Sequence, residues 1–551
     1  MGKMLERVFC NSITAFIDRS SILNEYQFGC RKGYSAPDAL LKLINDIKSK
    51  QETNPKTRTS AIMVDIKGAF DNVDHKHLLE TLDKKNFPQG TIEWISSFIT
   101  NRSTAIITDG IVDKTRPTTK GIPQGSPLSP ILFNIYTTGL YHRLSEIPGI
   151  KFAGFVDDVT IYCHDSQARA TNSLGLALKA CVEWATKAHT EIDLGDKLNF
   201  IHFGNKTANP PRLPVPCQQT LREPQDEAKV LGVILDRKLN FKPHISLKKE
   251  QAIQAINFIT RLGGTTDGLT GFAFKLLYNS CIVPIISYGV GVWGNNPNTV
   301  KKMGNSIQLT QNIALRRMLG AYRTTPIYIL HREAGVLPLH IKLEDLARRA
   351  AHRLSDPTRT HRDNPTKAQL LSGSVAAEAN SRLNSINRII SVNRPRISPA
   401  QASKRRALIQ WQHEHAIATT KASNSPHQPW YKGTYPNNKV ETNNNKLQLR
   451  RAMEGPRHIL SGAIQLKTGH GRFAKYIAER TKNEENIQNK CPLCEAEPET
   501  PKHILTACPC YDFIPTSLRI GNPFHLFTND LYDIISQVVQ TAKLDTQDRF
   551  Y

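Results

Sequence analysis

Residues 152–163 read Phe-Ala-Gly-Phe-Val-Asp-Asp-Val-Thr-Ile-Tyr-Cys, an apolar stretch interrupted by two adjacent acids. Apolar residues on both flanks of a short polar centre are typical of a β-hairpin, with Asp157 and Asp158 at its tip. Two buried carboxylates side by side are costly unless a cation neutralises them, and no Lys or Arg directly flanks this pair. The pattern therefore predicts a divalent metal site, and oxygen ligands of this kind suit Mg²⁺.

A third acid follows another apolar stretch. Residues 61–64 read Ala-Ile-Met-Val, a buried-strand pattern that ends at Asp65. If neighbouring strands carry these acids, three carboxylates can hold two Mg²⁺ ions about 3.5–4 Å apart for an in-line phosphoryl transfer. The alternative interpretation is a pair of structural turns, since a single Asp at a strand end often only caps a turn.

The segment 121–130 reads Gly-Ile-Pro-Gln-Gly-Ser-Pro-Leu-Ser-Pro and precedes an apolar helix predicted over 131–140. Glycines let the backbone approach a ligand closely, and prolines fix the loop. An ordinary loop with Pro at a helix start is the alternative. Further helices are predicted over 74–82 and 173–188, so the chain from 60 to about 241 reads as an α+β core.

Taken together, these motifs resemble those of the reverse transcriptases of non-LTR (LINE-like) retrotransposons. The order and spacing agree over roughly residues 20–330. The resembling segments are the first palm motif at 64–75, the second at 121–130, the third at 154–158, the fourth at 197–203, the primer-grip motif at 230–236 and the finger motif around Arg31. The resemblance implies a right-hand polymerase fold with partial fingers, a palm and a helical thumb.

The resemblance also implies the catalytic roles. Asp65, Asp157 and Asp158 are expected to bind two Mg²⁺ ions, with help from the backbone carbonyl of Ile66. Lys197 is expected to be the general acid for the pyrophosphate leaving group, and a solvated surface lysine is the alternative. The implied activity is RNA-directed DNA polymerisation during retrotransposition.

The nucleotide site follows from the same resemblance. Phe70 is expected to occupy the space of a ribose 2′-OH and so to favour dNTPs, and Gln124 and Gly125 are expected to line the pocket. Arg31 is expected to contact the template or the triphosphate. The implied partners are an RNA template with a DNA primer and dNTPs, and the sequence does not indicate an oligomeric state.

Composition and charge agree with a nucleic-acid partner. The 551 residues include 72 Lys and Arg against 48 Asp and Glu, a net charge of +24. Such a surplus attracts polyanions, although a basic surface that only keeps the protein soluble is the alternative. No run of 18 apolar residues predicts a membrane span, and the N-terminus is a poor signal peptide. We therefore expect an intracellular protein without a membrane partner, and the resemblance implies the nucleus or the cytoplasm.

Four of the ten cysteines crowd a short C-terminal segment. Its spacing is Cys491-x2-Cys494-x8-His503-x4-Cys508, which predicts a tetrahedral Zn²⁺ site; similar CCHC units close many LINE-like polymerases. Cys510 could replace Cys508 as the fourth ligand, and reduced thiols in a small core are the alternative. One structural Zn²⁺ would help such a small unit to fold and to hold RNA.

These observations predict four regions in the chain. They are fingers (partial) and palm at 1–245, a helical thumb at 246–355, a basic and partly disordered linker region at 356–454, and a CCHC zinc unit at 455–551. The predicted fold class is α+β for the polymerase, followed by a mainly helical basic region and the zinc unit. Segments rich in Pro, Asn, Ser and Thr, and the basic run 404–406, mark the linker region.

Some positions depart from the family pattern. Cys30 stands where an aromatic residue is usual, and 35–37 reads Ser-Ala-Pro. Finger strands upstream of residues 5–17, an endonuclease domain and a ribonuclease H pattern are not found, so an N-terminally truncated copy is expected. A catalytically silent remnant that only binds RNA is therefore the alternative function. A viral RNA polymerase, which would carry an acid in place of Phe70, and an intron-encoded maturase remain as other readings.

Overall fold

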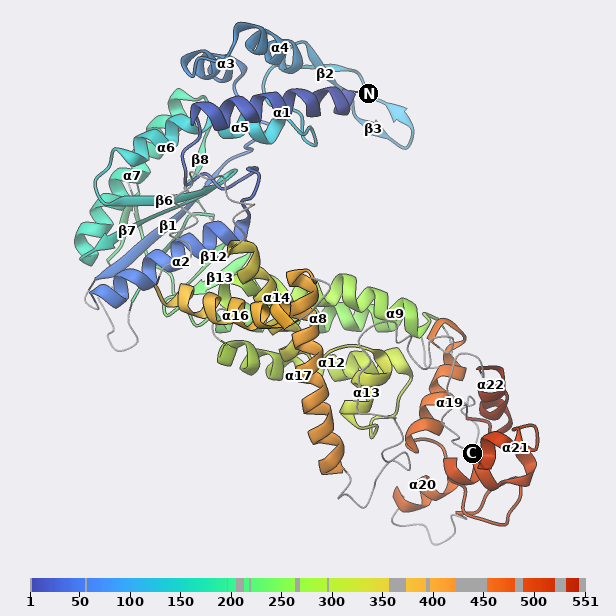
Figure 1. Ribbon diagram of the computed structural model, residues 1–551. Coiled ribbons are helices and arrows are strands. Elements are labelled where there is room, and N and C mark those ends of the chain that lie inside the picture. Colours follow the sequence, from blue (N-terminus) through green and yellow to red (C-terminus); the bar gives the residue numbers. More distant parts are fainter. Residues whose placement is uncertain are drawn as a thin grey trace. The chain divides into compact units, whose positions relative to one another are not determined.

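The computed structural model describes residues 2–54, 57–195, 197–204, 213–217, 220–262, 268–294, 297–355, 373–392, 397–422, 453–480, 489–520 and 532–544. The chain divides into two compact units (Figure 1). The first comprises 1–244, 291–293 and 351–381, and the second comprises 245–290, 294–350 and 382–551. Within the described ranges, no helix has the length and apolar character needed to cross a lipid bilayer.

A five-stranded antiparallel sheet forms the centre of the first unit. Its strands, in spatial order, are β6 (Ile150–Phe155), β7 (Asp158–Asp165), β1 (Arg58–Ile66), and then β8 (Ile192–Asp193) and β9 (Asn199–Phe203), which both pair with β1. β1 is buried from Thr59 to Ile66 because it has paired strands on both edges and helices above the sheet. This position explains the continuous apolar run at 61–64 and confirms the predicted strand.

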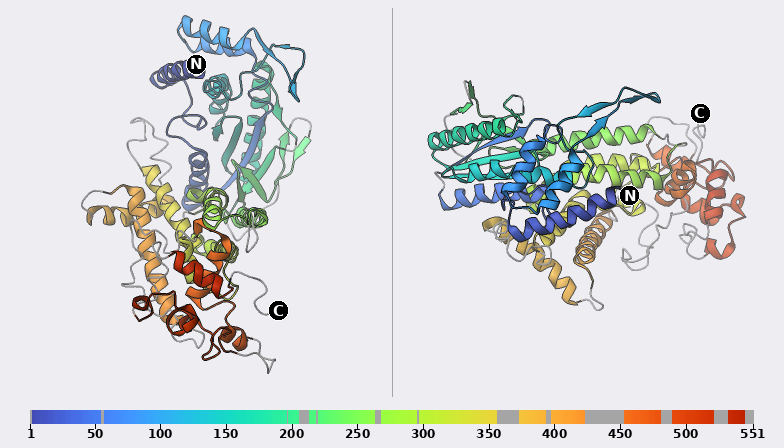
Figure 2. Two further views of the ribbon diagram at one scale, coloured as in Figure 1. Left: turned by 90° about the vertical axis from the view of Figure 1, so that its right-hand side faces the viewer. Right: turned by 90° about the horizontal axis from the view of Figure 1, so that it is seen from above.

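Helices cover both faces of this sheet (Figures 1 and 2). Along β6, Phe152 joins the large core formed with α6 and α7, whereas its neighbour Ala153 contacts Ala39 of α2 in a smaller cluster, as the two-residue period of a strand requires. The helices of the first unit up to residue 187 are α1 (Gly2–Ser20), α2 (Ala36–Thr53), α3 (His75–Lys84), α4 (Gln89–Ile99), α5 (Ser129–Tyr136), α6 (Thr138–Ser145) and α7 (Gln167–Lys187).

The predicted hairpin and helices form with small differences in their bounds. Asp74 is the N-cap of α3, and its side chain accepts a hydrogen bond from the His77 amide at 2.7 Å. The single helix predicted over 131–140 is wrong, because the structure has two helices that are separated at Thr137. The Thr137 hydroxyl lies within hydrogen-bond distance of the carbonyls of Phe133 and Asn134, a contact that competes with regular helix geometry.

Four two-stranded antiparallel sheets complete the described strands. They are β2 (Arg102–Thr104) with β5 (Arg116–Thr118), β3 (Ile107–Thr108) with β4 (Ile111–Val112), β10 (Val215–Cys217) with β11 (Thr220–Arg222), and β12 (Glu227–Val230) with β13 (Val233–Asp236). The β12–β13 hairpin spans the predicted primer-grip motif, and Gly232 takes a φ of 77° at its turn. Glycine adopts this left-handed conformation without steric cost.

The described chain after residue 241 is mainly helical. Its helices are α8 (Lys242–Arg261), α9 (Gly271–Leu277), the π-helix η1 (Tyr278–Ile282), α10 (Val283–Ser287), α11 (Val290–Trp293), α12 (Pro297–Leu319), α13 (Ile327–Ala334), α14 (Leu339–Ser355), α16 (Gly373–Val392), α17 (Pro399–Ala422), α19 (Arg457–Thr468), α20 (Ala474–Arg480), the π-helix η3 (His503–Ala507), the 3₁₀-helix η4 (Pro509–Tyr511), α21 (Thr516–Ile520) and α22 (Tyr532–Thr541). Two of them, α16 and α17, form within the predicted linker region. Within that region, 356–372, 393–396 and 423–452 lie outside the described residues.

The second unit joins the helices after 245 to the C-terminal segment. Lys467 of α19 donates to Glu333 of α13 at 2.6 Å, and both side chains are almost completely buried. Ser461 donates to the carbonyl of Gly320 at 2.7 Å, and the Arg457 guanidinium donates to the carbonyls of Leu269 and Arg317. These contacts attach α19 to the turns and helices between residues 269 and 334, so both segments share one compact unit.

Candidate active site and metal centre

The hairpin between β6 and β7 turns in two residues. Phe155 pairs with Asp158, which leaves Val156 and Asp157 as the loop. Val156 has a φ of 60°, a conformation that is strained for a β-branched residue. The sequence-predicted acids therefore lie at the hairpin tip, with Asp157 in the turn and Asp158 as the first residue of β7.

Strand register brings Asp65 to the same place. In the β1–β7 ladder, Asp65 lies directly opposite Asp158, so both side chains leave the same face of the sheet. Partial burial, and then the nearby charges of Asp157 and Asp65, raise the pKa of Asp158 to about 6. Burial and the charge of Asp65 also raise the pKa of Asp157. The three carboxylates are thus close enough to repel one another when they are ionised.

Lys197 is the cation that faces this group. Its ammonium lies 2.7 Å from Asp65 Oδ2, and this hydrogen bond raises the pKa of Lys197. The Lys197 side chain is 65% exposed, whereas that of Asp65 is 12% exposed. The lysine lies two residues before β9, which pairs with β1, so sheet pairing brings it to the carboxylates. Ile66 directly follows Asp65 at the end of β1 and pairs with Ile192 of β8.

The Gly/Pro loop at 121–130 joins the turn after β1 through its backbone. The amides of Gly121 and Ile122 donate to the carbonyls of Val73 and Phe70, each at 2.8 Å. Gly121 has a φ of 87°, and a Cβ there would lie 2.7 Å from the carbonyl oxygen of Asp71, so this position requires glycine. These bonds bring the first two predicted motifs together.

A pocket of about 680 Å³ lies beside this loop. Phe70, Gln124 and Gly125 line it, as predicted for a nucleotide site, together with Lys3 and Arg7 of α1. Sequence reasoning missed the two cations, although their spacing of four residues puts them on one face of a helix. The Gln124 amide donates to the Asp71 carboxylate at 3.0 Å. α1 is fixed to the loop because Glu6 accepts a hydrogen bond from Ser126 at 2.6 Å.

Arg31 lies away from the lining of this pocket. Its guanidinium donates to the carbonyls of Asn24 and Gln27 at 2.9 and 3.1 Å, and it stacks over the ring of Tyr34 at 4.7 Å. These contacts hold the turn in which Arg31 itself lies. The predicted contact of Arg31 with template or triphosphate stays a prediction.

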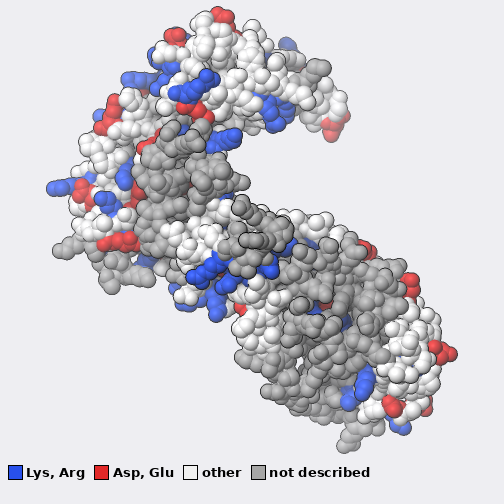
Figure 3. All heavy atoms as spheres, in the orientation of Figure 1, with Lys and Arg blue, Asp and Glu red and all other residues white. Residues whose placement is uncertain are grey.

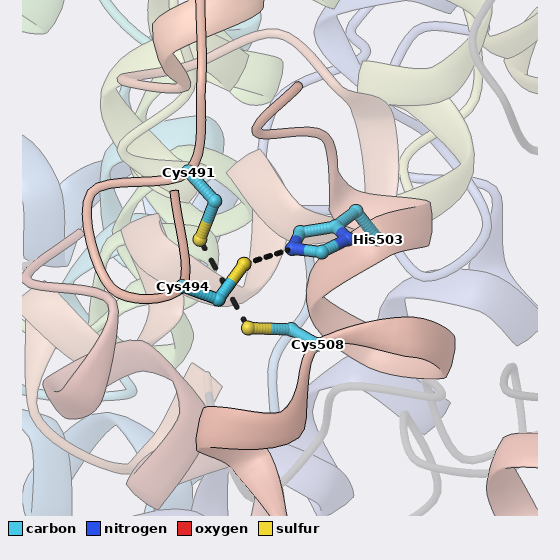
Figure 4. A group of neighbouring side chains, drawn as sticks. All are labelled: Cys491, Cys494, His503 and Cys508. Carbon is cyan, nitrogen blue, oxygen red and sulfur yellow. Dashed lines mark hydrogen bonds between the residues drawn. The ribbon is translucent and has the colours of Figure 1, made fainter. Parts of the chain in front are cut away.

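The four predicted zinc ligands meet in the second unit (Figure 4). Cys491, Cys494, His503 and Cys508 bring their ligand atoms within 4.8 Å of one another. Cys494 Sγ lies 3.2 Å from His503 Nε2, and Cys491 Sγ lies 3.9 Å from Cys508 Sγ. Among the described Cys, His, Asp and Glu side chains, this is the one group that converges so closely. Cys510 is exposed, so the structure favours Cys508 as the fourth ligand.

The surroundings of the cluster suit a metal. The other ring nitrogen of His503, Nδ1, lies 3.1 Å from the Glu497 carboxylate, so Nδ1 carries the proton and Nε2 is free to bind an ion. Burial raises the pKa of Cys491 and of Cys508. For Cys494, burial is outweighed by hydrogen bonds that include those from the backbone amides of Ala496 and Glu497, and its pKa is lowered to about 7. Soft thiolates with one imidazole are ligands that Zn²⁺ prefers.

Comparison with known proteins identifies relatives of this chain. Residues 1–235 match the family described as reverse transcriptase (RNA-dependent DNA polymerase), and this part of the chain is a reverse transcriptase domain. More narrowly, the chain is similar to RNA-directed DNA polymerases of mobile elements, as expected from its resemblance to the reverse transcriptases of non-LTR retrotransposons. It is 28% identical over 375 residues to a probable RNA-directed DNA polymerase from transposon BS of Drosophila melanogaster. It is 27% identical over 360 residues to the RNA-directed DNA polymerase from mobile element jockey of the same species.

These matches cover a larger share of this chain than of either relative. They include 66% and 64% of this chain but only 39% and 38% of the BS and jockey proteins. The chain therefore spans about two fifths of the length of these relatives. Among solved structures, apo telomerase from Candida tropicalis matches at a TM-score of 0.31 and 12% identity, over 66% of this chain and 59% of that one.

Proposed function

We propose that this chain is an RNA-directed DNA polymerase that adds dNTPs to a DNA primer on an RNA template. One observation carries the proposal: three carboxylates, Asp65, Asp157 and Asp158, adjoin at the ends of β1 and β7. The reverse transcriptase family of residues 1–235 supports the same reaction. The reaction is the in-line attack of a primer hydroxyl on the α-phosphate of a dNTP, with pyrophosphate as the leaving group.

The carboxylates fit divalent metal ions. The raised pKa values of Asp157 and Asp158 mean that these acids lack sufficient neutralising charge, which a hard divalent cation supplies. Two bound Mg²⁺ ions would stabilise the attacking and leaving oxygens of phosphoryl transfer. Lys197 then releases Asp65 and is free to donate a proton to the departing pyrophosphate.

The pocket beside the Gly/Pro loop is the proposed nucleotide site. The Phe70 ring, which contacts Phe133 with ring centroids 5.4 Å apart, would exclude a 2′-hydroxyl. Gln124 and Gly125 would contact the sugar and base, and the Ile66 carbonyl would assist the metal ligands. Arg31 would act on the template or triphosphate only if it leaves its present carbonyl partners.

The four regions predicted from the sequence are proposed here as the parts of the polymerase. Residues 1–245 would form partial fingers and palm, 246–355 the thumb, 356–454 a basic region and 455–551 the zinc unit. Exposed Lys404, Arg405 and Arg406 on α17 support RNA contact by the basic region. Basic side chains also gather in Figure 3 near the position of α14 and α16.

The Cys/His cluster would hold one structural Zn²⁺ ion. Four ligands of the right types within reach of one centre leave no open position for a substrate, which is typical of structural sites. The ion would stabilise the short elements around it, and the unit would help to retain the RNA template.

Primer extension tests the proposal. Purified protein, Mg²⁺, dNTPs and a primed RNA template should give extended DNA, and Asp157→Asn with Asp158→Asn should lower the rate by on the order of 10³-fold or more. Asp165→Asn, at the far end of β7, is the matched control and should extend normally. Wild-type protein that binds RNA without any extension would instead support a catalytically silent RNA-binding remnant.

A further inference from the structure

The segment before α2 runs beside the catalytic hairpin. The Phe28 amide donates to the carbonyl of Gly154 at 2.7 Å, and the Gly154 amide donates to the carbonyl of Tyr26 at 2.9 Å. Residue Gln27 thereby forms a parallel bridge with Gly154 of β6. The outer edge of the hairpin strand is thus paired with a short extended segment rather than left to solvent.

The same segment touches the hairpin turn itself. A Cβ on Gly29 would lie 2.5 Å from the Val156 amide nitrogen and 2.7 Å from its side chain. Only glycine permits this approach, so the backbone at Gly29 lies directly against the strained turn residue that precedes Asp157. The position of Gly29 therefore limits where the turn can lie.

Gln27 anchors this segment to the end of α5. Its side chain is 1% exposed, and its Nε2 donates to the carbonyl of Asn134 at 3.0 Å and to the Thr137 hydroxyl at 3.3 Å. Its Oε1 accepts from the Asn24 amide at 3.0 Å. Both ends of the amide are thus engaged, which fixes its orientation.

Asn134 supplies a second anchor. It is 2% exposed, and its Nδ2 donates to the carbonyl of Gly29 at 2.7 Å. Its backbone carbonyl also accepts from Gln27, so one residue of α5 bonds to two positions of the extended segment. Removing one partner of such a buried hydrogen bond leaves the other polar group unsatisfied, which costs about 1–3 kcal/mol of stability for each group.

We propose that Gln27, Asn134 and Thr137 are positioning residues for the proposed polymerase reaction. They fix the segment at 26–29 to α5, and that segment fixes the turn that presents Asp157 and Asp158. None of the three lines the nucleotide pocket. Their loss should therefore displace the metal ligands while leaving dNTP recognition intact. This inference rests on the proposed function, but the effect of these residues on the position of the hairpin turn can be measured without enzymatic activity.

The main variants are Gln27→Met and Asn134→Leu, which keep the side-chain size and remove the hydrogen bonds. We expect kcat for primer extension to fall about 10–100-fold and the Mg²⁺ concentration for half-maximal rate to rise several-fold. The KM for dNTP should change less than about twofold. Partial rescue by Mn²⁺, which binds carboxylates more tightly, is expected as well.

A second pair of variants, with smaller changes, distinguishes a positioning role from a general loss of folding. Thr137→Val removes the hydroxyl that accepts from Gln27, whereas Thr138→Val removes a neighbouring buried hydroxyl that donates only to the carbonyl of Ile135 at 2.7 Å. Hydrogen exchange of the amides at 154–159 should accelerate in Thr137→Val and Asn134→Leu and remain at the wild-type rate in Thr138→Val. This contrast needs no enzymatic activity.

The outcomes separate the two claims. Equal hairpin exchange in Thr137→Val and Thr138→Val, or an equal fall in kcat and rise in dNTP KM in the main variants, would overturn the positioning role. If the exchange contrast is present but wild-type protein extends no primer, the positioning network stands and the proposed activity fails. Faster exchange together with the kcat loss and unchanged dNTP KM would support both.

Discussion

The carboxylate site of the central sheet and the Cys/His cluster near the C-terminus are built in opposite ways. Asp65 and Asp158 lie on long, buried and fully paired strands, whose register brings them together without an ion. The Cys/His ligands lie in a segment with one isolated bridge, between Lys490 and Pro498, and short π and 3₁₀ turns. In the central sheet the paired strands create the carboxylate site, whereas the short elements of the C-terminal segment would gain stability from the proposed Zn²⁺ ion.

The largest expected effect concerns zinc. Cys494→Ser should lose the ion, and 489–511 should lose protection from proteolysis, because an apparent binding energy on the order of 10 kcal/mol disappears. Metal analysis and limited proteolysis measure both changes. Cys510→Ser, which alters an exposed thiol outside the cluster, should keep one zinc per chain. A wild-type protein that purifies without zinc would remove the basis of the comparison.

The next effect tests how the C-terminal segment is joined to the helices that precede it. Lys467→Met removes the buried ammonium that donates to the Glu333 carboxylate and should cost about 3–5 kcal/mol of the free energy of unfolding. Combining it with Glu333→Leu should restore most of that stability. Urea unfolding measures both, with Lys84→Met as a surface control, since the Lys84–Glu80 pair is exposed and should matter by less than about 1 kcal/mol.

A smaller effect is expected in nucleotide choice. Phe70→Ala removes the ring beside Gln124 and Gly125, and the preference for dNTP over rNTP should fall about 10–100-fold. The ratio of kcat/KM for the two nucleotides measures this. Phe70→Tyr retains the ring and should keep the preference. An unchanged ratio in Phe70→Ala would mean that another residue excludes the 2′-hydroxyl.

The smallest effect concerns pH and the end of the central sheet that lies farthest from the carboxylates. Burial lowers the pKa of His164 to about 4 and also lowers the pKa of His202. The Nε2 of His202 donates to the carbonyl of Leu213, so its Nδ1 accepts a hydrogen bond from the Ser60 hydroxyl. Since the unfolded chain binds these protons near pH 6.5, stability should fall as pH drops from 6.5 towards 4. His164 should contribute on the order of 1–2 kcal/mol between pH 6.5 and pH 5, and His202 should contribute in the same direction.

Thermal unfolding at pH 7.5 and pH 5 measures this contribution. His164→Gln should lose less stability between the two conditions than wild type does. His142→Gln changes an exposed histidine and should behave like wild type. If wild type and His164→Gln lose the same stability, the buried ring is already charged in the folded protein.

Much of the central sheet could be predicted from sequence because its signals are local. The apolar runs at 61–64 and 152–163 determine two strands, and the acids inside them determine where charge must be neutralised. The Cys and His spacing likewise predicted a cluster that the structure forms. In each case the proposed ligand residues are themselves part of the sequence pattern that predicts the site.

Other features depend on contacts between distant residues. The anchoring of Gln27 by Asn134 and Thr137 involves polar groups more than 100 residues apart, and their types alone do not indicate burial. The buried Lys467–Glu333 pair, 134 residues apart, likewise has no local signal. Lys3 and Arg7 were missed because cations on a helix usually face solvent.

Val156 has a consequence for engineering this protein. A β-branched residue at a φ of 60° is a position where a stability screen would select glycine, since the change relieves on the order of 1 kcal/mol of backbone strain. The same change would remove the side chain that contacts Gly29 and would loosen the turn before Asp157. Variants selected for thermostability without an activity readout would therefore tend to carry glycine at position 156 and to lose activity.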